Sequence, residues 1–278
     1  NRLTFGTRRP ARRPAPPRSR NAVPRAVAVN VAANTNEPGF RGPVYPDGSF
    51  AYVPIPEAAP TLSRERFPVD EPLPTYADLS LPFSVPTSLR ETPVHMDPEF
   101  PGVHGRDHAS YGDPYGVKAG RIAGLEPGDW LLFYATLSLR PHGWAGPGTD
   151  GSRDPVRRDD DLAPDWGAYL FAGIRVEGVL AVEAGDGAVG RDAAAALAPT
   201  NAHLKRDPFD ARVVVAGDPA ASGPFERVVP LSTPETGADA NRIVTELSSD
   251  SGRGPWWRRP MQFDSEATEI VLNRIQVA

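Results

Sequence analysis

The chain has no cysteine among its 278 residues, which excludes a disulfide scaffold, a thiol nucleophile and a cysteine-ligated zinc site. Lysine is almost absent, since Lys118 and Lys205 are its only two positions, and arginine carries nearly all of the positive charge. No apolar run is long enough to span a membrane. We therefore expect a soluble, cytoplasmic protein without a membrane partner.

Proline and glycine are abundant instead, with 33 and 26 residues. Both favour turns, loops and short elements over a bundle of helices. Apolar runs of strand length recur between them. We predict an α+β fold with a mainly antiparallel, strongly bent sheet, a few short helices and long loops.

Acidic residues are missing from the first 25 positions, which contain eight arginines. We expect residues 1–24 to form a disordered tail rich in arginine and proline, either a nucleic-acid arm or a segment without a role. Residues 25–278 are predicted to form a single domain. Because the whole chain carries −5 and the first 25 residues carry +8, residues 26–278 carry −13. A part this acidic is not a general binder of phosphate backbones.

A short apolar run at residues 26–29 is predicted to be a buried strand, and a long polar loop follows it. Asparagine and glycine cluster in this loop, which is a common way to arrange amide groups around a ligand. The alternative is that these residues only shape turns. The candidate ligand-binding residues of this stretch are Asn30, Asn34, Asn36, Arg41, Tyr45, Asp47, Tyr52 and Glu57.

A second polar cluster occupies residues 94–118. Its candidate catalytic groups, as acids or bases, are His95, Asp97 and Asp113. His104 and His108 are four residues apart, a spacing that would align two metal ligands on a helix. The surrounding prolines and glycines argue against a helix, so we assign no metal site and no cofactor. We interpret the cluster as a hydrogen-bonding loop that packs near the first one.

A Pro-Gly-Asp turn at residues 127–129 precedes the apolar run 130–135, which we predict to be a buried central strand. Gly128 is expected to need a backbone conformation that is open mainly to glycine. A side chain at this position should strain the turn.

The order of these segments resembles the nucleotide modification associated domain family, type three. The matching pieces lie within residues 26–235 and are NVAANTNEPGFRGPVYPDGSFAYVPIPE, HMDPEF, YGDP, LEPGDWLLFYATL, AYLFAGIRVEGVL, NAHLKRDP and VVVAGDP. The resemblance implies an association with DNA or nucleotide modification systems of prokaryotes and their viruses, with proteins of such a system as partners. The resemblance implies a biological context, and it specifies no chemical reaction.

The LEPGD turn, the LLFYA strand and the later GIRV segment are also similar to the centre of PUA-like domains. That second resemblance implies a small β-barrel with a pocket at its mouth for a flipped base. It offers a barrel as the alternative to the bent sheet.

Three functions are compatible with these observations. The first is a module that binds a modified base or a nucleotide, with amides on the polar edge of the base and a tyrosine stacked on its face. The second is an enzyme that acts on a nucleotide or a DNA base, which requires a group from residues 95–113 to reach the first loop. The third is a structural partner in a modification complex, with Trp256 and Trp257 as an exposed aromatic patch.

Binding of a nucleotide or base gives an expectation about the site, and the alternative is that the polar segments are separate surface loops shaped by turn chemistry. We expect the loop at residues 30–57 and the cluster at residues 95–113 to line a single pocket, because loops at strand ends often converge at one rim of a sheet. The later residues expected at this pocket are Tyr134, Asn201 and His203.

Overall fold

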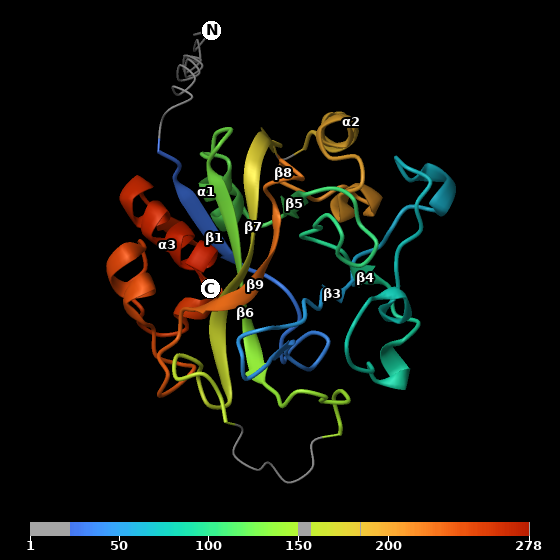
Figure 1. The fold of residues 1–278 in the computed structure, drawn as a ribbon. Helices are drawn as coiled ribbons and strands as arrows, with labels where there is room; N and C mark the ends of the chain where they lie inside the picture. Colours follow the sequence, from blue (N-terminus) through green and yellow to red (C-terminus); the bar gives the residue numbers. More distant parts are fainter. Residues whose placement is uncertain (1–22, 150–156, 184, 278) are drawn as a thin grey trace, which may run out of the picture.

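Two long antiparallel strands, β6 (Trp130–Leu139) and β7 (Trp166–Ala181), form the centre of the fold (Figure 1). They belong to an eight-stranded sheet with the order β10-β1-β6-β7-β8-β5, in which β2 lies beside β6 and β9 beside β7. This computed structural model describes residues 23–149, 157–183 and 185–277, so residues 1–22 of the predicted tail lie outside it.

The remaining elements are short. The other strands of the large sheet are β1 (Ala26–Asn30), β2 (Pro43–Val44), β5 (Ser110–Asp113), β8 (Val213–Gly217), β9 (Gly223–Pro230) and β10 (Met261–Phe263). A separate antiparallel pair consists of β3 (Ile55–Pro56) and β4 (Val94–His95). The α-helices are α1 (Gly116–Ile122), α2 (Gly187–Leu197) and α3 (Ser265–Val277). The single-turn helices are η1 (Arg64–Arg66), η2 (Tyr76–Asp78), η3 (Thr87–Leu89), η4 (Ala202–Lys205), η5 (Ile243–Leu247) and η6 (Trp256–Arg258). Within the described ranges, no helix combines the length and the apolar character that crossing a bilayer requires.

The sheet is open, so the prediction of an α+β fold with a mainly antiparallel sheet is confirmed and the barrel alternative is wrong. Most pairs are antiparallel, but β1 and β2 both run parallel to β6. The strand path ends at β10 on one side and at β5 on the other, and these two strands do not pair in the described chain. The register shifts within β6 and β7, and β7 changes partner from β9 to β8 along its length.

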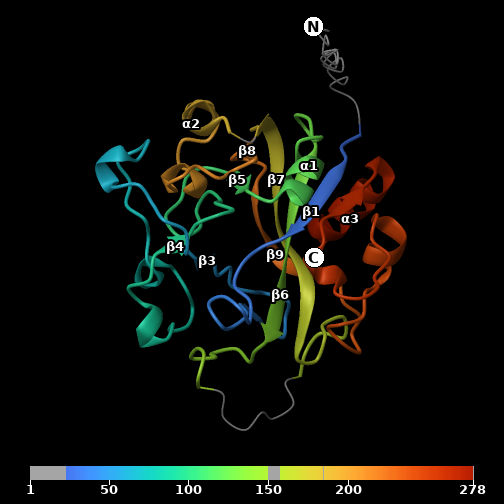
Figure 2. The same cartoon turned by 180° about the vertical axis from the view of Figure 1, so that it is seen from behind.

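Alternation along β6 explains why both faces of the sheet are buried. Leu131 and Phe133 point into the larger core, which the loop segment 57–108 covers. Leu132 and Tyr134 point into a second core beneath α3. Figures 1 and 2 show α3 on one side of the sheet and the cyan-to-teal loop segment on the other.

The expected aromatic patch at Trp256 and Trp257 is not on the surface, and this interpretation is wrong. Trp256 is fully buried, and its indole N–H donates a hydrogen bond of 2.8 Å to the carbonyl of Ala238. Trp257 is partly buried and packs edge-on against Trp256 and Trp166. The two arginines that follow in the sequence suggested exposure, but η6 turns the tryptophans toward the core.

The turn before β6 has the predicted glycine conformation. Gly128 has a φ of +93°, which confirms the prediction. A Cβ atom at Gly128 would meet no other atom within 4 Å, so a substitution there costs backbone strain alone.

Replacing Gly128 with alanine should therefore lower the free energy of unfolding by about 1–3 kcal/mol through this strain. Gly120 is the matched control, because it lies on the exposed side of α1 with no atom within 4 Å of an added Cβ. Gly120→Ala should instead stabilise the protein by about 0.5–1 kcal/mol, since alanine loses less backbone entropy in a helix. Urea denaturation of both variants measures the two effects, and equal signs would contradict this account of the turn.

Candidate functional site

A polar cavity of about 230 Å³ opens where three distant parts of the chain meet. The chain directly after β1 forms one wall, the segment from β4 to α1 forms the second, and η4 with Arg206 forms the third. A larger hollow of about 530 Å³ lies between β9 and α3, but its ion pair, Arg227 with Asp159, is solvent-exposed. The smaller cavity is the candidate site because buried ionisable groups gather in it.

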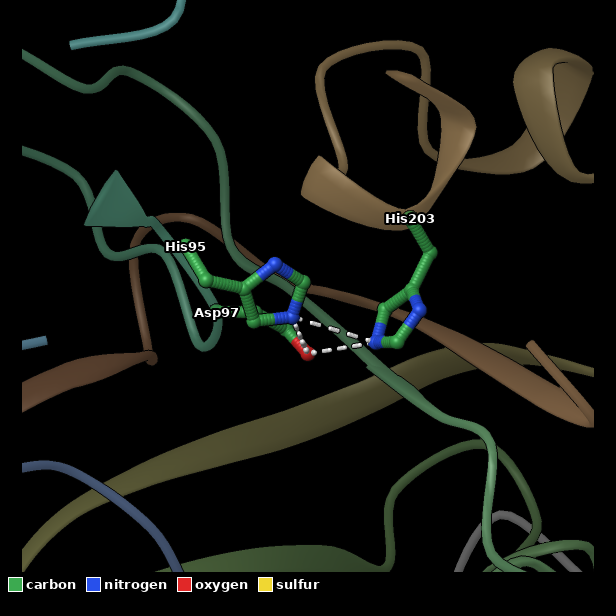
Figure 3. A group of neighbouring side chains, drawn as sticks. All are labelled: His95, Asp97 and His203. Atoms are coloured by element: carbon green, nitrogen blue, oxygen red, sulfur yellow. Dashed lines mark hydrogen bonds and ion pairs between the residues drawn. The ribbon is translucent and has the colours of Figure 1, made fainter. Parts of the chain in front are cut away.

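Three of these buried groups point at one another: His95 on β4, Asp97 just after it, and His203 in η4 (Figure 3). The Nε2 atoms of the two histidines are 3.3 Å apart. Asp97 Oδ2 lies 3.3 Å from Nε2 of His203 and 3.8 Å from Nε2 of His95. Such a group of two imidazoles and one carboxylate can hold a metal ion or transfer protons.

Each histidine is held from behind by a second carboxylate. His95 Nδ1 lies 2.7 Å from Glu57 Oε2, and His203 Nδ1 lies 2.6 Å from Asp210 Oδ1. Arg206 bridges these two carboxylates, with contacts of 3.0 Å to Glu57 and 2.7 Å to Asp210. Since a carboxylate at neutral pH can only accept, both Nδ1 atoms carry a proton and both Nε2 atoms face the centre of the group.

The local charges shift the protonation of these groups. Burial lowers the pKa of His203, but hydrogen bonds to Asp210 and Asp97 outweigh it and raise the pKa to about 9. Burial lowers the pKa of His95 and dominates there over the hydrogen bond to Glu57. Burial raises the pKa of Glu57, but His95 and Arg206 outweigh it and lower the pKa to about 2. The charged form of His203 is therefore favoured between the carboxylates of Asp97 and Asp210.

Asp97 and His203 are oriented by Gly112 and Asn201. The backbone N–H of Gly112 donates to both oxygens of Asp97, at 3.0 and 3.1 Å, and the Asn201 side-chain amide donates to Oδ1 at 3.0 Å. The amide oxygen of Asn201 accepts the N–H of His203 at 3.1 Å and so begins η4. A Cβ at Gly112 would lie 2.5 Å from His203 Cδ2, so this close packing requires glycine.

The opposite wall carries Asp113, Lys118 and Tyr115. Asp113 Oδ2 accepts the hydroxyl of Tyr111 at 2.6 Å and lies 3.6 Å from Lys118 Nζ. Lys118 also donates to the backbone carbonyl of Asn30 at 3.1 Å, which ties α1 to the end of β1. The ring of Tyr115 is 68% exposed beside the cavity and offers a face for stacking.

Eight of the fourteen residues expected at one pocket line this cavity or support it. Those that line the cavity are Asn30, Asn34, His95, Asp97, Asp113 and His203. Glu57 and Asn201 support it from behind through the bonds given above. Sequence reasoning missed Arg206, Asp210, Gly112, Lys118 and Tyr115 as parts of this site. The spacing of Arg206 and Asp210, four residues apart with opposite charges, was the one local signal for that pair.

The other expected residues lie elsewhere. Arg41 stacks over Trp166 at 4.5 Å from the ring centroid, Tyr45 stacks on His142, and Asp47 accepts the N–H and hydroxyl of Ser49. Tyr52 and Tyr134 are buried and donate to the carbonyls of Pro98 and Arg259. Asn36 is exposed, and its N–H donates to Asn34 Oδ1, so turn chemistry explains this part of the loop.

His104, considered above as a metal ligand, uses both ring nitrogens for structure. Its Nδ1 accepts the N–H of Ser80 at 3.2 Å, and its Nε2 lies 2.9 Å from the carbonyl of Tyr52. The histidine that joins His95 at the cavity is His203, 108 residues further along the chain.

A GxGxxG pattern at residues 185–190 follows β7 and leads into α2. In dinucleotide-binding folds this pattern lies between two parallel strands. Here β7 pairs antiparallel with β8, and Gly190 instead lets α2 pack on Val182 and Phe209. The pattern is therefore a packing feature.

Comparison with known proteins gives the family. The family model for nucleotide modification associated domain 3 matches residues 25–273, a range that includes every residue of the cavity. Searches of curated proteins and of solved structures gave no match. The resemblance inferred from the order of segments is thereby confirmed, and the chain belongs to the nucleotide modification associated domain 3 family.

Proposed function

We propose that the cavity bounded by Asn34, Tyr115 and the His95–Asp97–His203 group binds a nucleotide or a nucleic-acid base. The observation that carries this proposal is the convergence of three polar segments on one cavity. The family match supports a role associated with nucleotide modification. A modified base is one ligand of this class.

The size of the cavity favours a single base or nucleoside. Pockets for drug-sized ligands span about 300–1,000 Å³, and this cavity of about 230 Å³ lies just below that range. A dinucleotide cofactor would need more room. The exposed ring of Tyr115 provides a stacking face, and the amide nitrogen of Asn34 provides a donor for a base edge, since the amide oxygen already shapes the turn.

The chemistry of the cavity favours an enzyme over a passive reader. The enzyme hypothesis requires a group of the 95–113 cluster to reach the first loop, and the 2.7 Å bond between His95 and Glu57 meets this requirement. Burying ionisable groups costs folding free energy. Buried groups with shifted pKa values in a cavity are typical of functional sites. The structural-partner hypothesis loses its main support, because Trp256 is buried.

Calorimetric titration with nucleosides, nucleoside monophosphates and short oligonucleotides with modified bases tests the proposal. Asn34→Ala and Tyr115→Ala should each weaken binding by about 1–3 kcal/mol, or about 5–150-fold. Arg41→Ala is the control, because Arg41 stacks on Trp166 away from this cavity, and its affinity should equal that of the wild type. The proposal fails if no compound binds, or if Arg41→Ala loses as much affinity as the two cavity variants.

A further inference from the structure

We propose that His95, Asp97 and His203 bind one divalent transition-metal ion through the two Nε2 atoms and Oδ2. The inference goes beyond nucleotide binding, because the site needs no nucleotide and can be tested with a metal ion alone. Four features of the described structure carry it: the spacing of the three atoms, their orientation, the local charge, and the access from the cavity.

The spacing of the three atoms fits a metal ion. They form a triangle with sides of 3.3, 3.3 and 3.8 Å. The point equidistant from all three lies about 2.0 Å from each, which matches bonds of about 2.0–2.2 Å from zinc to histidine nitrogen or carboxylate oxygen. The spacing of the three atoms therefore suits a single ion.

The orientation of the imidazoles is the one that metal ligands need. Glu57 and Asp210 accept hydrogen bonds from the Nδ1–H groups of His95 and His203, so the Nε2 atoms face each other and Asp97. A carboxylate behind a ligating histidine is the usual way to fix the ring and its tautomer. Asp97 is fixed as well, since the N–H of Gly112 donates to both of its oxygens and the Asn201 amide donates to Oδ1, while Oδ2 also faces the histidines.

The charge around this point is negative. The carboxylates of Glu57, Asp97, Asp113 and Asp210 face the cations Lys118 and Arg206, so one negative charge remains with His203 protonated and two remain once a metal ion has displaced that proton. The side chains of His95, Asp97 and His203 are only 4%, 2% and 2% exposed. Buried charge of this kind is costly unless it is paired or coordinates a metal, and a divalent cation would offset it.

The access from the cavity indicates open coordination positions. Structural zinc sites are usually closed by four protein ligands, whereas catalytic sites keep positions for water or substrate. Here three protein ligands lie in the wall of a cavity of about 230 Å³. Two imidazoles and one carboxylate suit iron, zinc, manganese or cobalt better than magnesium or calcium, which prefer oxygen ligands. A water or a substrate atom would complete the coordination from the cavity side.

The test is titration of the chelator-treated full chain with Co²⁺, Zn²⁺, Mn²⁺ and anaerobic Fe²⁺, without any nucleotide. We expect one ion per chain by calorimetry, a rise in the melting temperature, and visible absorption bands for the cobalt form. Glu57→Gln removes a hydrogen-bond partner of a ligand and should weaken metal binding by about 10–100-fold. Asp97→Asn and His203→Ala change the ligands themselves and should weaken metal binding by more than this.

Two further variants keep the test decisive. Gly112→Ala retains all three ligands but places a methyl group 2.5 Å from His203 Cδ2, so it should weaken binding by at least about tenfold. His108→Ala removes an exposed histidine outside the group and should bind as the wild type does. Melting curves without metal identify any variant that fails to fold. The titration of the wild type tests metal binding even if every variant fails to fold. The proposal is overturned if the wild type binds none of the four ions, or if the folded Asp97 variant binds them equally well.

Discussion

Replacing Trp256 with alanine is expected to lower the free energy of unfolding by about 3–5 kcal/mol, the range for deleting a fully buried aromatic side chain. Trp256 has no exposed surface and belongs to the core beneath α3, beside strands β1 and β10. The substitution would leave a cavity in this core and an unpaired carbonyl at Ala238. Denaturation in guanidinium, followed by circular dichroism, measures the loss.

Trp257→Ala is the matched control for this prediction. Trp257 lies next in the chain and contacts the same aromatic cluster, but it is only partly buried. Its replacement should cost clearly less, because the hydrophobic contribution scales with the area removed from water. If the two variants lose equal stability, Trp256 does not act as the anchor of this core.

Arg106→Met should cost a similar amount, about 3–5 kcal/mol, by leaving a buried charge without its partner. Arg106 donates to Glu99 Oε2 at 3.0 and 2.9 Å, and the Glu99 side chain has no exposed surface. Glu99 Oε1 accepts the hydroxyls of Ser110 and Thr200, which do not neutralise its charge. Thermal and chemical denaturation of the variant measure the effect.

The exposed pair Arg242–Glu246 is the control for this second prediction. Its contact of 2.7 Å is even shorter than those of Arg106, but its side chains are 84% and 51% exposed. Arg242→Met should cost less than about 1 kcal/mol, as exposed ion pairs usually do. Adding Glu99→Gln to Arg106→Met should recover part of the stability, because it removes the unpaired charge. A double variant as unstable as Arg106→Met alone would point to lost packing instead.

Strands β1 and β6 could be predicted because each is an apolar run, whereas β5, with the sequence SYGD, has no such pattern. The Pro-Gly-Asp turn and the strand after it are local signals, and both have the expected form. Sheet closure is not a local property. The same alternation along β6 suits a barrel or an open sheet, and the choice depends on β10, which pairs with β1 from the other end of the chain.

The site could be predicted only in part, for a similar physical reason. Histidine, aspartate and asparagine in polar segments marked His95, Asp97, Asn201 and His203 as candidates. Their convergence depends on long-range packing, since His95 and His203 lie 108 residues apart. Local turn chemistry made Asn36 and Asp47 resemble ligand-binding residues. Tyr134 was misplaced because one step along a strand moves a side chain to the opposite face.

The position of β1 has a consequence for how the protein is made. Strand β1 pairs on one side with β6 and on the other with β10. In the sequence, β6 begins at Trp130, 100 residues after β1 ends at Asn30, and β10 lies near the other end of the described chain. During synthesis, a ribosome therefore releases β1 long before either neighbour exists. An unpaired apolar strand invites association with other chains. The nascent protein thus has a long interval in which a chaperone can shield β1, and this interval ends when Met261–Phe263 emerges and joins the sheet.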